Sequence, residues 1–369
     1  MMPHGHFRPM VPHGGHGTRD GTYGERYLPH GATGVGDAGP SGVGSLGGSQ
    51  RGAPRCRLRK DSFVHDVYRL GETLGEGAFS EVLQATHLLT GQQVACKKMK
   101  LPPPTDPNYA LTTQEISKEI DILCSLEHEN LLSLIEYFVQ GEHIYLFTEL
   151  VSGGDLLTAL HRVESFSEDS ARFVFVQLLK GVQHMHARNI AHRDLKLENI
   201  LLSHTGPMGL TIKIGDFGLA KHVDNRGYLT TVCGSPQYVA PEVVTGSNSA
   251  VYGPKVDMWG AGVVLYMLLA GYPPFEGDSH AELFAQVKAG RFSLELPVWD
   301  TISTEAKDLI CRLLVVNPEA RLTATDALRH PWLMCVAPQP EQPKWGSRMK
   351  EAMKKPFTGI LTKSFTKKV

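Results

Sequence analysis

Apolar and β-branched residues alternate with polar ones from Tyr68 to Lys100, which is the period of strands that bury one face. Turn signals at Glu76-Gly77 and Thr90-Gly91 divide this stretch into three segments, because a glycine beside a polar residue favours a chain reversal. We therefore predict three antiparallel strands here and two further strands over residues 131–138 and 143–149.

Helical spacing begins in residues 113–126, where Ile116, Ile120 and Leu123 recur every three or four positions. After Gly153-Gly154 the pattern becomes mainly helical, and the predicted helices span residues 170–187, 255–270 and 304–314. The order of elements predicts an α+β fold with two lobes. Residues 67–150 form a small antiparallel-sheet lobe with one main helix, and residues 151–333 form a larger helical lobe.

Both ends of the chain differ in composition from this region. Residues 1–60 contain 15 of the 38 glycines and 6 of the 23 prolines. Such a segment buries too little apolar surface to offset its conformational entropy, so we predict disorder over residues 1–66. Its five histidines leave metal binding open beside plain low complexity. Residues 334–369 are predicted to form a basic, mostly disordered tail.

Composition and charge narrow the class of protein. The chain has 41% hydrophobic and 20% charged residues with a net charge of -1, which excludes a collagen-like or wholly disordered protein. The ends are cationic, with eight basic and three acidic residues in 1–60 and eight and two in 334–369. The 21 basic and 33 acidic residues between them make the folded region acidic, which favours basic partners.

Three sequence signals, a membrane-spanning stretch, a secretory signal and paired cysteines, bear on where the protein is located and on whether its cysteines are oxidised. The longest uncharged apolar stretch, residues 259–272, is shorter than the roughly 20 residues of a membrane-spanning helix. The first thirty residues have no apolar block of a secretory signal. We expect no membrane association, no direct nucleic-acid binding, and a location in the nucleus, the cytoplasm or both. Six scattered cysteines without a C-x-x-C pair predict free thiols.

A glycine-rich segment at a strand-to-strand turn is the first candidate for chemistry. Gly75 and Gly77 let the backbone approach phosphates closely, Ser80 stands where a third glycine is usual, and Val82 follows on the next strand. A phosphate-binding loop and an ordinary glycine-rich turn remain equal interpretations of this segment alone.

Lys97 ends the third predicted strand, where a lysine can reach the α and β phosphates of a nucleotide. It needs a carboxylate to orient it, and Glu119 of the following helix is well placed. The alternative is a solvated surface pair that contributes little.

The segment His192-Arg193-Asp194-Leu195-Lys196-Leu197-Glu198-Asn199 decides between these interpretations. It is followed by Asp216-Phe217-Gly218 and then by Ala240-Pro241-Glu242. Phosphoryl transfer needs a carboxylate at the incoming hydroxyl and further oxygen ligands that hold magnesium on the phosphates. Asp194 fits the first role, and Asn199 with Asp216 fits the second.

With these motifs, residues 67–333 resemble the eukaryotic protein kinase family. The resemblance implies ATP and magnesium as cofactors, and it implies that Asp257 and the pair Glu242 and Arg321 stabilise the fold. It also implies that Glu149 and Val151 meet adenine through their backbone and that Thr148 is the gatekeeper. The residues it places around the adenine ring are Leu74, Val82, Ala95 and Leu201.

The resemblance is to serine/threonine kinases, because Lys196 follows the base by two residues and Ser235 stands where such kinases carry a supporting threonine. Within the family it is to the calcium/calmodulin-dependent kinase group, and there to checkpoint kinase 2-like catalytic domains. Residues 1–66 are too short and glycine-rich for the forkhead-associated domain of those relatives. A signalling role is implied, with checkpoint or cell-cycle signalling as one possibility.

The same resemblance suggests a substrate preference. Asp155 and Glu198 lie along the peptide groove of the family, where carboxylates attract an arginine three residues before the target. Met267 stands where the most basic-selective kinases carry an acid. Val232, Pro236 and Val239 would line an apolar pocket for the residue after the target. The alternative for Asp155 is a bond to the ATP ribose.

Several residues are candidates for regulation. Thr231 aligns with the activation-loop phosphosite of the family and Thr230 is a second candidate, so an upstream kinase or trans-autophosphorylation is implied. Ser62 follows Arg59 by three residues and precedes Phe63, which makes it an autophosphorylation candidate. In the tail, residues 345–355 form a short basic amphipathic pattern. A solvated tail or nuclear-import signal is favoured there over a calmodulin site.

Two other functions remain to be weighed. A pseudokinase scaffold would fold alike and signal by binding, but such proteins usually lack the lysine, the base or the metal aspartate. A kinase of small molecules would not need the Ala-Pro-Glu segment and the peptide groove. We therefore expect a kinase of protein serine and threonine residues, with calmodulin regulation as a further alternative.

Overall fold

The computed structural model describes residues 57–76, 80–203, 210–218, 220–222, 235–245 and 253–334. All of them belong to one compact unit, residues 50–369. Most of the two predicted disordered ends therefore lies outside the described residues.

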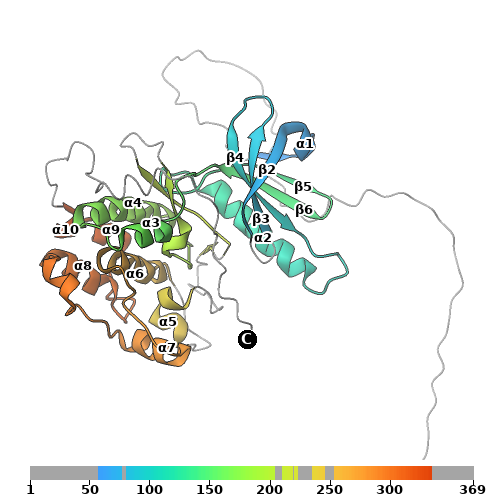
Figure 1. Ribbon diagram of the computed structural model, residues 1–369. Coiled ribbons are helices and arrows are strands. Elements are labelled where there is room, and N and C mark those ends of the chain that lie inside the picture. The colour runs from blue at the N-terminus through green and yellow to red at the C-terminus, as the bar shows by residue number, and fades with distance from the viewer. Residues whose placement is uncertain are drawn as a thin grey trace, which may run out of the picture. The chain divides into compact units, whose positions relative to one another are not determined.

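The first lobe is built on a six-stranded sheet with the strand order β1-β5-β6-β4-β3-β2 (Figure 1). The three strands predicted between residues 68 and 100 are confirmed as β2 (Tyr68–Glu76), β3 (Ser80–His87) and β4 (Gln93–Lys100), which pair antiparallel. The next two strands are β5 (Leu134–Gln140) and β6 (His143–Glu149). The predicted α+β fold, with its sheet-rich first lobe, is confirmed.

One long helix, α2 (Tyr109–Ser125), belongs to this lobe. It begins four residues before the predicted start at 113. Its inward face carries Glu119 together with Ile120 and Leu123, all of which are buried. The helix thus places a carboxylate within the apolar contact between itself and the sheet.

Ordered structure begins earlier than the predicted boundary at residue 67. Residues 57–59 form β1 (Arg57–Arg59), which pairs parallel with β5, and α1 (Val64–Val67) follows. A three-residue strand and a one-turn helix carry too few positions to show a period, so their sequence gives no signal. Tertiary contacts hold them instead, because Val64 is buried beside Tyr68 and Phe138 on one face of the sheet.

The second lobe is mainly helical, as predicted. The helices α4 (Glu168–His186), α6 (Lys255–Ala270) and α8 (Thr304–Leu313) match the predicted ranges within two residues. The shorter helices are α3 (Leu156–Val163), α5 (Pro241–Val244), α7 (His280–Ala289), α9 (Ala324–Leu328) and α10 (Pro331–Met334). Two small ribbons complete the lobe: β7 (Ile190–Ala191) with β10 (Lys221–His222), and β8 (Ile200–Ser203) with β9 (Thr211–Ile214).

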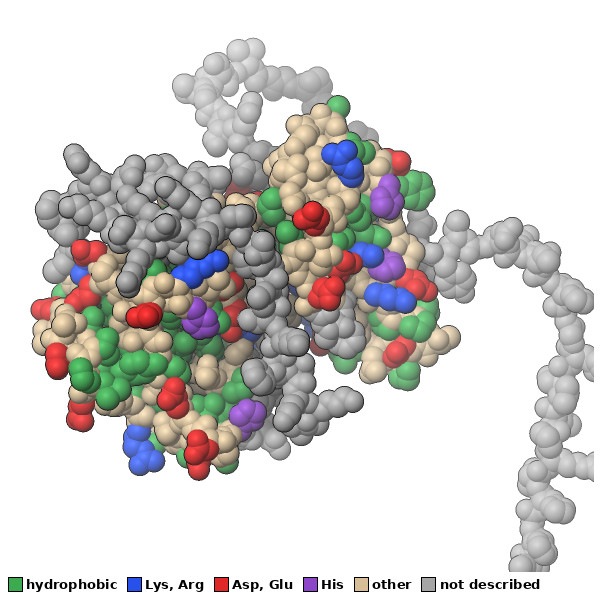
Figure 2. Space-filling model, viewed as in Figure 1, with side chains coloured by type: hydrophobic (Ala, Val, Ile, Leu, Met, Phe, Trp, Pro, Cys, Tyr) green, Lys and Arg blue, Asp and Glu red, His purple; other side chains and the backbone are tan. Residues whose placement is uncertain are grey.

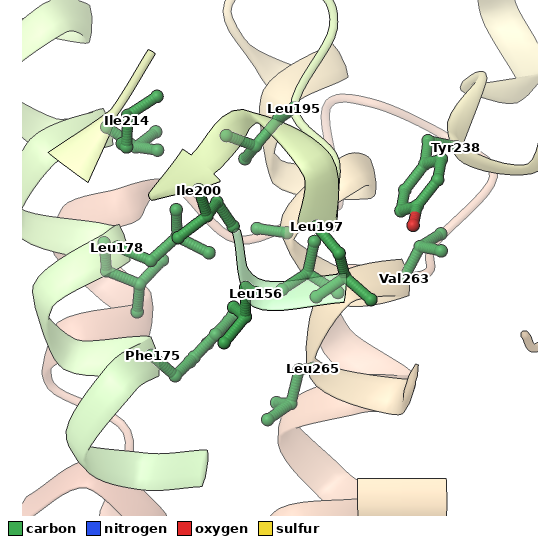
Figure 3. Close-up of a cluster of buried hydrophobic side chains, with 14 of the residues drawn as sticks. Leu156, Phe175, Leu178, Leu195, Leu197, Ile200, Ile214, Tyr238, Val263 and Leu265 are labelled. Carbon is green, nitrogen blue, oxygen red and sulfur yellow. The ribbon is translucent and has the colours of Figure 1, made fainter. Parts of the chain in front are cut away.

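The centre of this lobe is an apolar cluster around α6, whose residues are buried from Val256 to Ala270. Side chains from α3, α4, β8 and β9 meet those of α6 there (Figure 3). The segment around Leu195 and Leu197, which carries the predicted chemistry, lies directly on this cluster. The apolar core of the second lobe therefore supports the candidate site.

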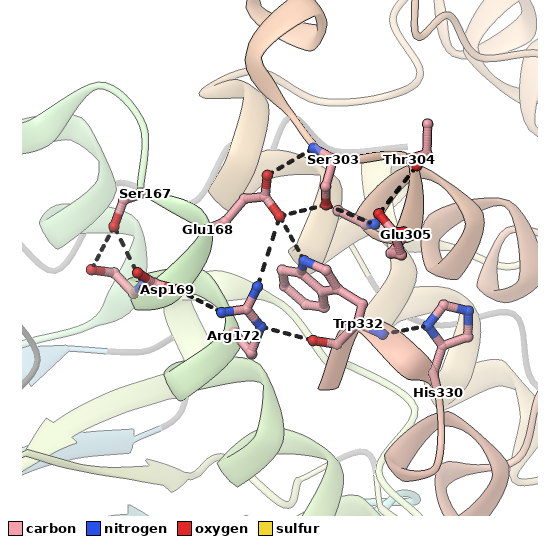
Figure 4. Close-up of polar contacts among 11 residues, drawn as sticks. Ser167, Glu168, Asp169, Arg172, Ser303, Thr304, Glu305, His330 and Trp332 are labelled. Carbon is pink, nitrogen blue, oxygen red and sulfur yellow. Dashed lines mark hydrogen bonds and ion pairs between the residues drawn. The ribbon is translucent and has the colours of Figure 1, made fainter. Parts of the chain in front are cut away.

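The end of the described domain is fastened to α4 by a polar network (Figure 4). Glu168 accepts hydrogen bonds from Trp332 Nε1 at 2.7 Å and from Ser303 Oγ at 2.6 Å. Arg172 donates to the Trp332 carbonyl at 2.8 Å and lies 5.0 Å from the Trp332 ring centroid. These contacts tie three helices, α4, α8 and α10, to one carboxylate.

Among the described cysteines, the prediction that all are free is wrong for Cys124. Cys96 and Cys311 are free thiols, and burial raises the pKa of Cys96 to about 12. Cys124, at the end of α2, is disulfide-bonded. A single bridge needs only two cysteines that meet in the fold, and sequence spacing does not reveal such a meeting.

Within the described ranges, no helix has the length and apolar character needed to cross a bilayer.

Candidate active site

The alternation of β-strands puts four of the predicted nucleotide-binding residues on one face of the sheet. Val82 lies directly opposite Lys97 in the β3–β4 pair, and Ala95 lies opposite Thr148 in the β4–β6 pair. Directly opposed residues share a face, and Ala95 and Lys97 are two positions apart on one strand. Gly75 pairs with Val82 on the same side of the lobe. Cys96, between Ala95 and Lys97, points to the other face.

Lys97 pairs with Glu119 of α2, as predicted. The Nζ atom of Lys97 donates to Glu119 Oε1 at 2.7 Å, and Asp216 Oδ1 lies 4.0 Å from the same nitrogen. Burial acts to lower the pKa of Lys97, but the two carboxylates outweigh it and the pKa lies above its ordinary value. The ammonium is therefore charged, and it links the sheet, α2 and the second lobe. A solvated surface pair does not describe this geometry, since Glu119 is buried.

The segment that carries Asp194 and Lys196 owes its shape to the leucines between them. Leu195 and Leu197 are buried in the apolar cluster (Figure 3). An extended segment that buries alternate residues turns the intervening ones to the opposite side. On α6, Gly260 allows this close packing, because a Cβ there would lie 2.9 Å from the Leu195 carbonyl oxygen.

Asp194 is surrounded by donors that fix its carboxylate. Lys196 Nζ donates to Oδ2 at 2.6 Å, and the Asn199 amide donates to the same oxygen at 3.2 Å. Ser235 donates to Oδ1 through its backbone N–H at 3.1 Å and through its hydroxyl at 3.4 Å. Lys196 also donates to the Ser235 hydroxyl at 2.9 Å. The serine therefore touches both the carboxylate and the lysine, in the supporting position that the resemblance implied.

The residues predicted to hold magnesium have the right donor atoms. Asn199 uses its amide nitrogen for the Asp194 carbonyl at 2.8 Å, which directs that nitrogen away from a metal and leaves the amide oxygen for one. The Asp216 side chain is 57% exposed, so its oxygens can reach a ligand. Amide and carboxylate oxygens are the ligands that magnesium prefers. The pair fits the ion.

Asp257 does more than the fold-stabilising role predicted for it. Its two oxygens accept the backbone N–H groups of His192 at 2.9 Å and Arg193 at 2.8 Å, and His186 Nε2 lies 2.8 Å away. Although burial acts to raise it, hydrogen bonds from His186 and the Arg193 backbone hold the pKa of Asp257 below its ordinary value. Arg193 has φ of 72°, a conformation that costs a non-glycine residue free energy. The Asp257 carboxylate thus holds a strained turn just before Asp194.

A second strained residue presents Asp216. Its φ is 57°, and the residues on both sides of it are fixed. The carbonyl of Gly215 lies 2.9 Å from His192 Nε2, and Phe217 is buried with its ring 5.2 Å from the His192 ring. His192 therefore couples the turn before Asp194 to the turn that carries Asp216. The sequence motif contains this histidine, but its spacing alone does not reveal the contact.

The connection between the lobes contains an ion pair that the sequence did not indicate. Glu149 Oε1 accepts from the Ser133 N–H at 2.9 Å and from Lys213 Nζ at 2.8 Å. Lys213 lies on β9, three residues before Asp216. The predicted adenine contact of Glu149 uses its backbone, so the side chain is left for this interlobe contact.

Asp155 also has a structural role that the sequence did not indicate. Both of its oxygens accept from Thr158, through the backbone N–H at 2.8 Å and through the hydroxyl at 2.8 Å. It caps the N-terminus of α3. It also forms an isolated bridge with Leu201, which brings it next to a predicted adenine contact.

Two further residues predicted to contact adenine, Leu74 and Val151, are each half-buried. The predicted residues Gly77, Thr230, Thr231 and Val232 lie outside the described residues.

The predicted pair of Glu242 and Arg321 is confirmed. Arg321 donates to both Glu242 oxygens, at 2.8 Å and 2.9 Å, and its side chain is fully buried. The guanidinium also lies 5.2 Å from the Trp259 ring. A bidentate pair in this setting anchors α5, and with it the segment that carries Ser235, to α6 and the loop before α9.

Residues 68–333 match the family model described as the protein kinase domain. The chain belongs to the protein kinase family. A probable myosin light chain kinase of Dictyostelium discoideum is 39% identical over 279 residues, which cover 76% of this chain and 69% of the relative. A probable serine/threonine-protein kinase of the same organism, fhkC, is 41% identical over 268 residues, and human serine/threonine-protein kinase DCLK3 is 42% identical over 275 residues.

The alignments with the last two relatives cover 72% and 73% of this chain but only 44% and 40% of theirs. The shared region is the kinase domain, so the catalytic domain of this chain is that of a serine/threonine protein kinase. Kinases of this family act on proteins and use ATP with magnesium.

Proposed function

We propose that this protein kinase domain transfers the γ-phosphoryl group of ATP to serine or threonine hydroxyls, with Asp194 as the base. The observation that carries this role is the set of donors around Asp194. Lys196, Asn199 and Ser235 orient its carboxylate, so one oxygen can accept the proton of an incoming hydroxyl. The deprotonated hydroxyl oxygen of the substrate attacks the γ-phosphorus, and the bond from that phosphorus to the oxygen bridging to ADP breaks.

The negative charge of the ATP phosphates is proposed to be balanced by side chains whose positions the structure describes. Lys196 steadies the transferred group, and Lys97, held by Glu119, contacts the α and β phosphates. Asn199 and Asp216 hold magnesium, which neutralises phosphate charge when it is bound. Glu119 fixes Lys97, and His192 contacts the residues on both sides of Asp216, so the site is oriented before the nucleotide arrives.

The adenine ring is proposed to bind between the lobes, against the sheet face that carries Val82 and Ala95. Leu74 covers it on the same side, Leu201 closes it from the second lobe, and the backbone of Glu149 and Val151 meets its edge. Thr148 is buried and its hydroxyl donates to the Glu149 carbonyl at 3.3 Å. This small gatekeeper leaves room behind adenine for bulky ATP-competitive inhibitors. Unchanged inhibition of a Thr148→Met variant would argue against that arrangement.

The proposed substrate has an arginine three residues before the target and an apolar residue after it. Glu198 supports this preference. Burial, with the nearby carboxylates of Asp194 and Asp155, raises the pKa of Glu198 above its ordinary value. A desolvated carboxylate beside other acids gains from a guanidinium. Asp155, which is predicted to contact the arginine together with Glu198, already uses both oxygens for Thr158, which favours Glu198 as the main contact.

A peptide array with varied residues before and after the target tests this preference. We expect Glu198→Gln to reduce the selectivity for arginine about tenfold, because it removes one charge-assisted contact, and Asp155→Asn to change it less. A requirement for proline after the target would contradict the proposal. Equal activity toward arginine and alanine peptides in the unsubstituted chain would also contradict it.

Control of activity is proposed to act through the activation loop. Thr231, with Thr230 as a second candidate, would be phosphorylated by an upstream kinase or by a second copy of this chain. The position of Arg193 next to Asp194 supports this, since a cationic side chain beside the base favours a nearby phosphate. Full activity of a Thr231→Ala variant would rule out Thr231, and full activity of the variant with both Thr230→Ala and Thr231→Ala would rule out this control.

The narrower assignments stay proposals of the same kind. These are membership of the calcium/calmodulin-dependent group, closeness to checkpoint kinase 2-like domains, a location in the nucleus or cytoplasm, and regulation by calmodulin through residues 345–355. A pseudokinase scaffold is disfavoured, because Lys97, Asp194 and Asp216 are all present and lie within one site.

A further inference from the structure

Residues 57–67, here called the N-terminal strap, dock on the sheet of the first lobe. Its strand β1 pairs with β5, and Arg59 Nε donates to Glu136 Oε2 at 2.7 Å. The other oxygen of Glu136 accepts from the Tyr68 hydroxyl at 2.8 Å. Glu136 is 6% exposed, so Arg59 supplies the cation that this buried carboxylate needs.

Gln140 clamps the next part of the strap. Its Oε1 accepts from the Val64 N–H at 3.1 Å, and its Nε2 donates to the Ser62 carbonyl at 3.2 Å. Val64 is buried in the cluster with Tyr68 and Phe138. One glutamine side chain therefore fixes the backbone on both sides of Phe63.

The Ser62 hydroxyl forms no hydrogen bond with the described residues when the strap is docked. Its Oγ is buried and has no hydrogen-bond partner in the described part of the chain. A phosphate there would bring close to two negative charges and three acceptor oxygens to a buried position where the described residues donate no hydrogen bond to the hydroxyl. The docked strap and a phosphorylated Ser62 exclude one another.

Docking also occupies Arg59, the residue by which a kinase would recognise Ser62. Arg59 stands three residues before Ser62 and is engaged with Glu136, whereas Phe63, just after it, is 70% exposed. Release of the strap frees the arginine and the hydroxyl together. The sequence around Ser62 then has the form proposed above for the substrates of this domain.

We propose that Ser62 is a phosphorylation site that controls docking of the N-terminal strap and that this kinase domain modifies it on a second copy of the chain. The second half of the proposal rests on the proposed substrate preference. The Ser62 Oγ bonds to the γ-phosphorus of ATP, the bond from that phosphorus to the oxygen bridging to ADP breaks, and the hydroxyl proton passes to Asp194. Phosphorylation traps the released strap and leaves Glu136 without its arginine.

Limited trypsin cleavage after Arg59 and Lys60 of the full chain, located by mass spectrometry, tests the docking half. We expect Ser62→Glu to be cleaved about tenfold faster than the unsubstituted chain, because burial of an unpaired charge opposes docking. The matched Ser62→Ala variant is expected to be cleaved at the unsubstituted rate, since the hydroxyl has no partner to lose. Equal rates for the Glu and Ala variants would overturn the exclusion of phosphate by docking.

Phosphate transfer in trans tests the second half. The full chain acts as enzyme and the Asp194→Asn chain as acceptor, with phosphate at Ser62 measured by mass spectrometry. Gln140→Ala in the acceptor releases the strap without touching the recognised residues, so we expect it to be modified about tenfold faster. Adding Arg59→Ala to that acceptor should remove the gain. No effect of Gln140→Ala, or no effect of the added Arg59→Ala, would overturn the proposal.

A basic peptide offered to the same enzyme separates this inference from the proposed function. If the peptide is phosphorylated and Ser62 is not, modification by this domain is refuted and the proposed function stands. If neither is phosphorylated, the proposed function itself fails, and the trypsin measurement still decides whether a charge at Ser62 releases the strap.

Discussion

At the scale of the residue, motif spacing predicted which side chains gather, and the structure adds what holds them. The pairing of Lys97 with Glu119 follows from residue types and order, because a buried lysine in a phosphate site needs a carboxylate. The use of Asp257 to hold the backbone before Asp194 could not be predicted, since it depends on the path of α6 under that turn. The same is true of the contact between Lys213 and Glu149.

Ser235 gives a prediction at this scale. Ser235→Ala removes the hydroxyl that accepts from Lys196 at 2.9 Å, so we expect kcat to fall about tenfold, the usual effect of losing one hydrogen bond to a charged group. Ser235→Thr keeps the hydroxyl and should retain most activity. Steady-state kinetics of both variants check this, and equal activity of the Ala and Thr variants would contradict it.

At the scale of the element, the long helices and strands followed from periodicity, and the short ones did not. The helix α6 was predicted with its observed bounds because its apolar run is long and ends at Gly271, whose φ is 84°. The strap was missed because β1 and α1 form through contacts with Glu136 and Gln140, which lie more than seventy residues away. Sequence periodicity carries no information about such distant partners.

The network around Glu168 yields a prediction about pH. Burial acts to raise the pKa of Glu168, but hydrogen bonds from Ser303 and Trp332 hold it below its ordinary value of 4.5. A carboxylate whose pKa is lower in the folded state stabilises that state above its ordinary pKa, and the contribution is lost as pH falls through the folded value. We expect Glu168→Gln to lower Tm by a few degrees at pH 7.

The expected difference in Tm between Glu168→Gln and the unsubstituted chain shrinks below pH 4.5. Thermal unfolding at several pH values measures it, and Glu305→Gln is a matched control on an exposed carboxylate of α8. A Tm difference that does not depend on pH would show that the charge of Glu168 does not stabilise the domain.

At the scale of the molecule, the sequence predicted the division into two lobes but not the contacts that join them. A change from alternating to helical patterning marks the boundary near residue 150, while the ion pair of Lys213 with Glu149 joins residues 64 positions apart. On the face in Figure 2, acidic and basic side chains are interspersed over both lobes. The acidic excess of the folded region is therefore not gathered into one patch on that face.

The cationic tail gives a prediction at this scale. Residues 334–369 carry eight basic and two acidic residues, so they can compete with basic peptides for the carboxylates near Asp194. We expect removal of residues 335–369 to raise kcat/KM for a basic peptide at low ionic strength. The gain should shrink at about 0.5 M salt, where screening shortens the reach of the charges. A truncated chain with unchanged kcat/KM at low salt would contradict this competition.

The central claim is that Asp194 acts as the base of a serine/threonine protein kinase. The most direct measurement is transfer of labelled γ-phosphate from ATP to an arginine-containing serine peptide. The full chain and its Asp194→Asn variant are compared at saturating ATP and peptide. We predict measurable transfer by the full chain and a kcat lower by about 10²–10⁴ in the variant, with an unchanged Tm as proof of folding. Equal kcat values in the two proteins would contradict the account.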